Sequence, residues 1–188
     1  MRFLYTGSPA FNTPQNDPGN SLGGFVSSTV VPNDSPGNMF SDISYEGTLL
    51  RKSECRGYVL ENSTGASVTS ILFGYRLPPG SNFTLEVAFV TLDAAGQKME
   101  RLATAGSSPY IGTFVETLVT DSVDGSVSMG TMAAGAKLGF WLCRKLTGAL
   151  AVPTFATLQE EIDFYKAVST AGYNFSKKIQ LILKYTTT

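Results

Sequence analysis

The sequence of 188 residues contains no histidine. This absence excludes Ser-His-Asp and Cys-His catalysis, and with them every metal site that uses a histidine ligand. Acid–base chemistry would have to use carboxylates, lysine, tyrosine or cysteine. The acidic residues occur in small groups, which are Asp42 with Glu46, Glu54 with Glu61, Asp121 with Asp124, and Glu160 and Glu161 with Asp163. We interpret them as solvated acids of turns and of a helix start, and we predict no enzymatic activity, no catalytic residue, no cofactor and no metal site.

Charge is also scarce. Only 15% of the residues are charged, against roughly 25% in a typical globular domain, and the net charge is −1. Lysine and arginine form no cluster, so the electrostatic footprint of a nucleic-acid-binding protein is missing. No apolar run approaches the 20 or so residues of a transmembrane helix, and the opening "MRFLY" is too short for the apolar part of a signal peptide. We expect a chain that is made and folds in a cytoplasm, without a membrane or nucleic-acid partner.

Cysteine is limited to Cys55 and Cys143, which fall in two different predicted strands. We interpret them as two small buried apolar residues, with a disulfide as the alternative. The chain has no CxxC motif, which makes a cysteine-based zinc site an improbable use of these residues.

Short runs rich in β-branched and aromatic residues begin near residue 25 and are separated by turn formers. They are FVSSTVV, ECRGYVLEN, SVTSILFGYRL, FTLEVAFVTL, YIGTFVETLVT, SVSMGTM, KLGFWLCRKL and KKIQLILKYTTT. In KLGFWLCRKL the alternation places Phe140 and Leu142 on one face and Trp141 and Cys143 on the other. This pattern predicts an all-β antiparallel sandwich, jelly-roll or Ig-like, with Trp141 in the core or in a subunit interface rather than exposed as a glycan platform.

One segment has helical rather than alternating periodicity. In "TLQEEIDFYKAVSTAG" the apolar residues recur at spacings of four, three and three, and Thr157 and Glu160 fit a capping box. We predict one short helix near residues 157–170, ended by Gly172.

Residues 1–24 read differently from the rest of the chain. Three prolines and several glycines oppose a long regular element, although "RFLY" could add a short edge strand. The segment nevertheless carries large apolar side chains that require burial, namely Phe3, Leu4, Tyr5, Phe11 and Leu22. We predict an extended N-terminal arm over residues 1–24 that packs on a neighbouring subunit or another protein, followed by a β-sandwich domain over residues 25–188.

Two adjoining stretches, "SLGGFVSSTVVPNDSPGNMFSDIS" and "EGTLLRKSECRGYVLEN", carry a recognisable order of residues. The order is Asn38, Met39, Phe40, Asp42, Ile43, Ser44, Glu46, Gly47, Glu54, Arg56, Leu60 and Asn62. It resembles a group of virion structural proteins of tailed bacteriophages, in which a Gly/Ser-rich lead precedes such a segment and a strand of the form E-x-R-x-x-x-(V/L)-x-N. The middle position of E-x-R, often aromatic in that group, is Cys55 here. The resemblance covers about 45 residues and transfers no catalytic residue.

The resemblance implies a structural subunit of a phage virion, most simply an oligomeric component of a neck or tail ring. A capsid head-decoration protein is the alternative within the same class. A carbohydrate-binding sandwich that recognises a host glycan is the alternative from another class, and a groove lined by exposed aromatics would favour it. The expected partners are further copies of the chain and other virion proteins, and the expected location is the virion, after synthesis in a bacterial host cytoplasm.

Overall fold

The computed structural model of the chain describes residues 1–33, 38–40, 53–76, 83–105, 127–146, 156–160, 162–163 and 180–187. Several predicted features lie outside these residues. They are the strand in YIGTFVETLVT, the acids Asp42, Glu46, Asp121 and Asp124, and most of the helix predicted over residues 157–170.

Strands make up most of the described chain. In order they are β1 (Arg2–Ser8), the 3₁₀ helix η1 (Pro18–Asn20), β2 (Gly23–Val30), β3 (Ser53–Glu61), β4 (Val68–Arg76), β5 (Phe83–Val90), β6 (Lys98–Arg101), β7 (Val127–Met132), β8 (Lys137–Leu146) and β9 (Gln180–Thr187). Seven of these strands coincide with runs that the sequence predicts, β1 contains the "RFLY" for which the sequence allows a short edge strand, and β6 is the addition.

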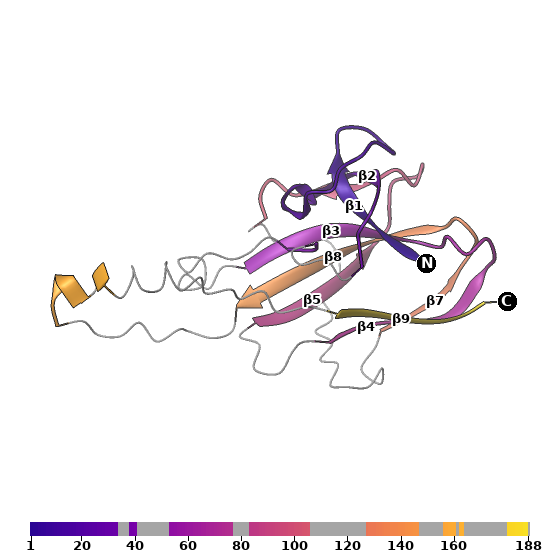
Figure 1. Ribbon diagram of the computed structural model, residues 1–188. Coiled ribbons are helices and arrows are strands. Elements are labelled where there is room, and N and C mark those ends of the chain that lie inside the picture. Colours follow the sequence, from indigo (N-terminus) through magenta and orange to yellow (C-terminus); the bar gives the residue numbers. More distant parts are fainter. Residues whose placement is uncertain are drawn as a thin grey trace.

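The strands form two sheets. Six of them follow the order β5-β8-β3-β1-β2-β6, and three follow the order β7-β4-β9. Each pair of neighbouring strands is antiparallel. Figure 1 shows β4 and β9 on one side of β3, β8 and β5, and shows β1 and β2 curling over the other side. The predicted all-β antiparallel, sandwich-like fold is confirmed.

The main core lies between the three-stranded sheet and the strands β5, β8 and β3. Phe73 of β4 is its centre, with ring centroids 5.4 Å from Phe140, 5.3 Å from Phe89 and 6.3 Å from Phe3. Edge and tilted contacts of this kind stabilise aromatic pairs by about 0.5–1.5 kcal/mol beyond the area that they bury. The alternation predicted for β8 is confirmed, because Phe140 and Leu142 enter this core while Trp141 faces the opposite side.

A second, smaller core covers the opposite face of the six-stranded sheet. Trp141 is fully buried there, together with Met99 of β6 and with Leu102, the residue that follows β6. Gly57 of β3 leaves the space that the indole needs, since a Cβ at Gly57 would lie 3.0 Å from both Trp141 and the Met99 sulfur. The curled end of the sheet, with β6, therefore covers Trp141 of β8 in the middle of the same sheet. The prediction of Trp141 in the core is confirmed.

The predicted N-terminal arm is wrong for residues 2–8. They form β1, which lies inside the six-stranded sheet between β3 and β2. Leu4 and Tyr5 are only 3% and 1% exposed within their own chain. The prolines that suggested an irregular arm all follow β1 and do not interrupt it. Because they dominate the composition of residues 9–22, they gave no indication that the strand before them lies inside the sheet.

Residues 9–22 are irregular, as predicted, but hydrogen bonds hold them on the same sheet. The buried Thr6 hydroxyl donates to the Gly57 carbonyl at 2.7 Å and accepts from the Gly23 N–H at 3.1 Å. The Gly57 N–H donates to the Ser21 carbonyl at 2.7 Å. Because these buried polar groups hydrogen-bond one another, Ser21 at the end of the segment is fixed against β1 and β3.

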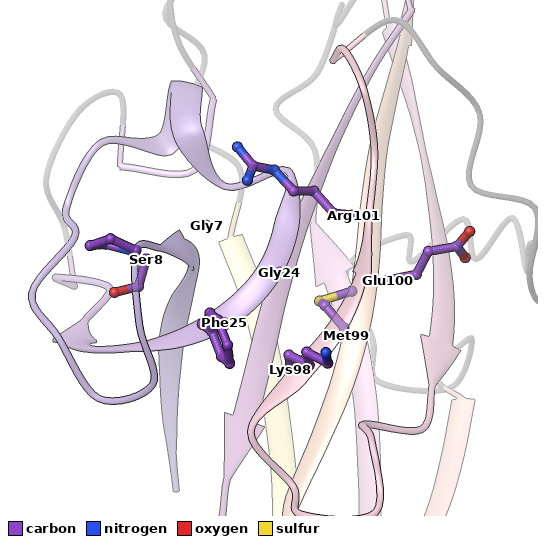
Figure 2. Close-up of a pocket in the computed structure, with 9 residues that line it drawn as sticks. Gly7, Ser8, Gly24, Phe25, Lys98, Met99, Glu100 and Arg101 are labelled. Atoms are coloured by element: carbon purple, nitrogen blue, oxygen red, sulfur yellow. The ribbon is translucent and has the colours of Figure 1, made fainter.

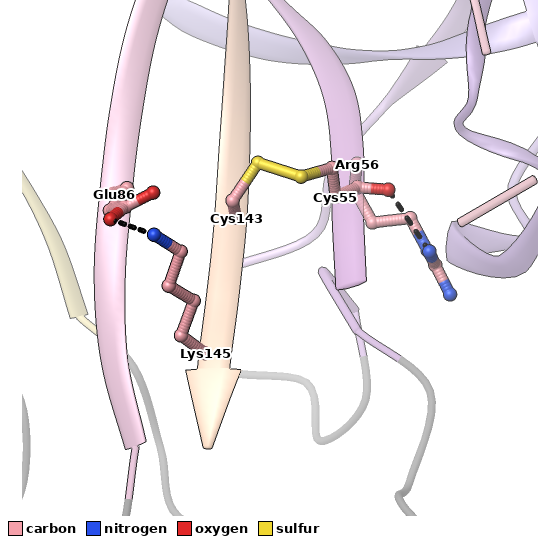
Figure 3. Close-up of a disulfide and its surroundings, with 5 residues drawn as sticks. All are labelled: Cys55, Arg56, Glu86, Cys143 and Lys145. Carbon is pink, nitrogen blue, oxygen red and sulfur yellow. Dashed lines mark hydrogen bonds and ion pairs between the residues drawn. A yellow bond between two sulfur atoms is a disulfide. The ribbon is translucent and has the colours of Figure 1, made fainter. Parts of the chain in front are cut away.

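The interpretation of Cys55 and Cys143 as two separate buried residues is wrong. They are directly opposite each other in the β3–β8 ladder, with their Cα atoms 4.0 Å apart, and they form a disulfide. Figure 3 shows the bond crossing between the two strands. Sequence alone gave the two strands but not their register, and only the register brings the two sulfur atoms together.

The predicted helix start is confirmed in the described part of that segment. Residues 158–160 and 162–163 are helical. The Glu160 N–H donates to the Thr157 hydroxyl at 3.2 Å, while the Glu160 carboxylate accepts from the Ala156 and Thr157 N–H groups at 2.9 and 3.3 Å. This reciprocal arrangement is the capping box that the sequence predicts.

Candidate functional site

The carboxylates of the described residues do not converge on one place. Three of them instead form ion pairs with bases of a neighbouring strand, which are Glu54 with Arg144, Glu61 with Lys137 and Glu86 with Lys145. The described residues contain no group of three or more His, Cys, Asp or Glu side chains that could hold a metal ion. A helix long and apolar enough to cross a membrane is likewise absent from the described part of the chain.

The five residues predicted to carry the interaction of an arm all pack within their own chain. Leu4 and Tyr5 are core residues, and Phe3 packs on that core. Leu22 packs on the cluster around Trp141, and Phe11 packs on a third buried cluster, which Leu4, Val26 and Val59 form. Their need for a dry surface is met inside the domain, so they do not form an exposed docking site.

The first half of the stretch that resembles virion proteins is fixed to the sheet by two tyrosines. The Tyr5 hydroxyl donates to the Asn38 carbonyl at 2.8 Å, and the Tyr58 hydroxyl donates to the Met39 carbonyl. Burial raises the pKa of Tyr58 well above its ordinary value and raises that of Tyr5 as well. Both phenols are therefore neutral donors at physiological pH.

Its second half, on β3, provides a charged cluster at the end of the main core. The Glu54 carboxylate lies 2.9 Å from Arg144 Nη2 and 3.6 Å from Arg56 Nη2. Arg56 also donates to the Cys55 carbonyl at 3.0 Å, and the Arg144 guanidinium lies 4.6 Å from the centre of the Phe40 ring. Figure 3 shows Arg56 directed away from the disulfide. Both arginines are more than nine-tenths buried, so the cluster links the stretch to the core rather than to solvent.

Asn62, the last residue of that stretch, is a buried turn anchor. Its two side-chain N–H groups are shared among the carbonyls of Ala66, Met132 and Ala133, whose oxygens lie 2.8, 3.0 and 2.9 Å from Nδ2. These bonds tie the β3–β4 turn to the turn that precedes β8. Every described residue in the resemblance thus has a place in the framework of the domain.

A half-open groove lies on the curled end of the six-stranded sheet. It has a volume of about 630 Å³ and is lined by Gly7, Ser8, Pro9, Gly24, Phe25 and the four residues of β6. The Lys98 ammonium lies 5.8 Å from the centre of the Phe25 ring, within reach of a cation–π contact. Figure 2 shows Lys98 beside Phe25 and shows the Glu100 side chain directed away from them. The groove therefore combines an apolar floor with the positive charges of Lys98 and Arg101.

A tight turn sets the position of the groove's edge strand. The Asp93 carboxylate accepts from the Gln97 N–H at 2.6 Å and from the Lys98 N–H at 3.2 Å. The hydrogen bond from the Gln97 N–H is the main reason that the pKa of the Asp93 carboxyl is lower than its ordinary value, and the bond from Lys98 lowers it further. The turn delivers β6 to β2, where Phe25 pairs with Lys98.

A second exposed feature is the short helix at residues 158–160 and 162–163, hereafter the projecting helix. Figure 1 shows it well away from both sheets. Its apolar residues Leu158 and Ile162 are 72% and 37% exposed. Large apolar side chains on a helix ordinarily face a core, so their exposure singles this element out.

Comparison of the chain with protein-family models, with curated proteins and with solved structures returns no match.

Sequence reasoning did not identify the groove. The edge strand β6 has only four residues. Four other lining residues of the groove belong to the segment interpreted as an arm, namely Gly7, Ser8, Pro9 and Gly24. The one available signal was the turn sequence "DAAGQ" before "KMER", which is typical of a hairpin. The projecting helix was predicted, although its exposure was not.

Proposed function

We propose that the chain is a non-enzymatic structural subunit of a tailed-phage virion, an oligomeric component of a neck or tail ring. The observation that carries the proposal is the resemblance of residues 21–62 to such proteins. The described residues of this stretch stabilise the domain. The carbonyls of Asn38 and Met39 accept the hydrogen bonds of Tyr5 and Tyr58, and Glu54 and Arg56 belong to the buried charged cluster.

The surface supports an assembled rather than a solitary role. Only 15% of the residues are charged, and Leu158 and Ile162 are exposed on the projecting helix. Exposed large apolar residues that occur together mark interaction sites. A repeated building block with few charges uses such residues when its copies cover one another.

The disulfide is compatible with the virion as the final location. Disulfides are rare in the reducing cytosol and persist at virion surfaces and in other oxidising settings. A chain made in a bacterial cytoplasm would gain the Cys55–Cys143 bond once it is in a released particle, where an external oxidant such as dioxygen takes up the two electrons and two protons that the thiols lose. The β3–β8 ladder holds the two residues opposite each other, ready for that oxidation.

The carbohydrate-binding alternative receives less support. Trp141, the strongest stacking side chain of the sequence, is fully buried. Among the described aromatic residues, the groove contains Phe25 alone. A head-decoration protein belongs to the same class as the proposal, and position in the particle separates the two.

The test is to find the chain in particles. An affinity-tagged copy should be incorporated into tailed particles during infection, and electron microscopy of gold-labelled particles should place it at the neck or tail. Label over the whole head would favour the decoration alternative. Absence of the chain from purified particles would contradict the proposal.

The non-enzymatic part has its own assay. The purified chain should not degrade phage-receptor polysaccharides. Turnover that disappears in Glu54→Gln or Glu86→Gln would contradict it, because loss on mutation rules out a contaminating hydrolase.

A further inference from the structure

The two sheets end in four edge strands, and three of these edges are protected against a further strand. The edges are β5 and β6 of the six-stranded sheet and β7 and β9 of the three-stranded sheet. β6 has only four residues, of which three are charged, and β7 pairs with β4 through a register that shifts on both sides of Gly130. β5 has its side chains covered already, since Leu85 and Val87 are at most 1% exposed. Short, charged or irregular edges oppose the addition of another strand.

The fourth edge, β9, has none of these protections. Its eight residues, QLILKYTT, contain no proline, no glycine and a single charge, that of Lys184. Its register with β4 is regular from Gln180 to Lys184, and none of the described strands lies on its outer side. Figure 1 shows β9 running beside β4. A long and weakly charged edge of this kind is a template for an extended strand, because its outward N–H and C=O groups can continue the ladder.

The side chains of β9 that face the main core are incompletely covered. Leu183 lies opposite Phe73 of β4, and Leu181 lies opposite Tyr75. The two β4 residues are 1% exposed, whereas both leucines are only partly buried. Tyr185, which alternation places on the same face, is 40% exposed. A further strand beside β9 would therefore cover an apolar row as well as pair the backbone.

We propose that β9 of one copy pairs antiparallel with β9 of a second copy, across a two-fold axis at Leu183. The two three-stranded sheets then join into one sheet of six strands. This inference goes beyond the proposed function, because a two-fold contact supplies a dimer and does not itself close a ring. Two paired edges are small against the roughly 1,600 Å² of a standard interface, so the dimer should be weak, with a Kd in the micromolar range or above.

Self-complementarity is the reason for choosing a second β9 as the partner strand. A two-fold antiparallel pair places one residue opposite its own copy, because directly opposite residues lie on the same face of the sheet. A centre at Lys184 would set two ammonium groups against each other, and a centre at Ile182 would pair only residues 180–184. A centre at Leu183 pairs residues 180–186. It sets Tyr185 against Leu181 on the core side and Lys184 against Ile182 on the other side.

This register predicts opposite effects for two charges at one position. Ile182 lies opposite Gly74 of β4, on the side of the sheet away from the main core, so both variants should keep the fold. Ile182→Lys places a second ammonium opposite Lys184 of the other copy, whereas Ile182→Glu places a carboxylate there. Each pair occurs twice in a two-fold dimer, so Ile182→Lys should associate about 5- to 30-fold more weakly than Ile182→Glu at low salt. Sedimentation over a range of concentrations measures the difference, and urea unfolding checks the fold.

A double variant and a control on another surface complete the set. Ile182→Lys with Lys184→Glu restores opposite charges across the axis and should associate as Ile182→Glu does. Leu158→Lys adds the same charge at the most exposed of the large apolar residues in the described part of the chain. It should associate as the unchanged protein does, because the projecting helix has no part in this contact.

Hydrogen exchange locates the contact independently of any substitution. In an edge strand every second N–H points outward and exchanges freely, whereas the others donate to the neighbouring strand. When the concentration of the unchanged chain rises, NMR should show slower exchange at the outward N–H groups of β9 and no change in β7, the opposite edge of the same sheet.

Several results would overturn the inference. They are an unchanged chain that stays monomeric up to about 1 mM, equal association of Ile182→Lys and Ile182→Glu, and loss of association in Leu158→Lys. Equal association would also be the result if β9 were exchanged between copies, because residue 182 would then still lie opposite Gly74. None of these results touches the proposed function, which is contradicted by absence of the chain from purified particles and not by the state of the free chain.

Discussion

Gly23 lies at the closest approach between β2 and β6. Its φ is +82°, in the left-handed region that glycine adopts without strain, and a Cβ there would lie 1.8 Å from the Glu100 carbonyl oxygen. Gly7 has the same combination, with φ +81° and the Asn20 carbonyl oxygen at 1.9 Å. Gly7 and Gly23, which made residues 1–24 resemble a linker in composition, thus permit two close backbone contacts at the curled end of the sheet.

This reading predicts a large difference between two glycine substitutions. Gly23→Ala should lower the free energy of unfolding by about 3 kcal/mol or more, because the backbone strain is joined by a collision with the Glu100 carbonyl. Gly65→Ala is the control, since Gly65 has the same φ of +82° and nothing within 4 Å of its Cβ position. It should cost only about 1–2 kcal/mol. Urea unfolding measures both, and equal effects would contradict the packing at Gly23.

The buried phenol of Tyr58 predicts the alkaline limit of stability. Burial raises its folded pKa, so the unfolded chain loses the proton first as the pH rises. The stability that the neutral phenol provides is complete below pH 10 and is lost as the pH rises from there toward the raised folded pKa. The free energy of unfolding should therefore fall above about pH 10.

Tyr58→Phe should reduce the slope of that fall, and it should also lower stability at neutral pH by about 1–3 kcal/mol, because the Met39 carbonyl loses its donor. Tyr185→Phe, on an exposed residue, should leave stability at neutral pH unchanged. Unfolding curves between pH 7 and 11 test both expectations. An unchanged slope in Tyr58→Phe would show that the phenol ionises without unfolding.

At the scale of elements, β1 is the strand that joins the two halves of the large sheet. It pairs with β3 over Arg2–Tyr5 and with β2 through a register broken by irregularities at Thr6 and Ser8. Removing residues 1–8 should leave no folded domain, because β2 and β6 would lose their connection and the main core would lose Tyr5. A separate arm over residues 1–24, as the sequence predicts, would instead leave a folded domain after its removal. Circular dichroism and proton NMR dispersion of the truncated chain decide between them.

The disulfide predicts a second effect at this scale. It closes a loop of 88 residues, for which loop entropy gives a stabilisation of about 4–5 kcal/mol. Dithiothreitol should lower the urea midpoint, whereas the variant Cys55→Ala/Cys143→Ala should be insensitive to it. Thiol titration of the denatured, unreduced protein should find no free thiol. Two free thiols in material taken from particles would contradict the bond.

The elements that sequence predicts well are those with a long local pattern. Alternation identified β8 and assigned Trp141 and Leu142 to their correct faces, and the pair Thr157 and Glu160 identified the helix start. The failures have a common physical cause, since each depends on contacts between distant residues. The position of β1 inside the sheet, the register that joins Cys55 to Cys143, and the groove between β1, β2 and β6 are all set by long-range pairing that no local window contains.

At the scale of the whole molecule, the chain has few charges to hold partners. Only 15% of its residues are charged and the net charge is −1. Among the described residues, Val30, Leu158, Ile162 and Tyr185 are large apolar residues exposed at the surface. An oligomeric subunit of this composition would depend on apolar and uncharged polar contacts more than on ion pairs.

The low charge of the chain predicts how self-association should respond to salt. Exposed charges attract over a distance of about 10 Å at 0.1 M ionic strength and about 3 Å at 1 M. Because only 15% of the residues are charged, we expect apolar and uncharged polar contacts to hold the copies of the proposed oligomeric subunit together. Raising the salt from 0.05 to 0.5 M should therefore leave self-association unchanged or strengthen it. Sedimentation at several salt concentrations measures the trend, and association that weakens steeply with salt would mean that ion pairs hold the copies together.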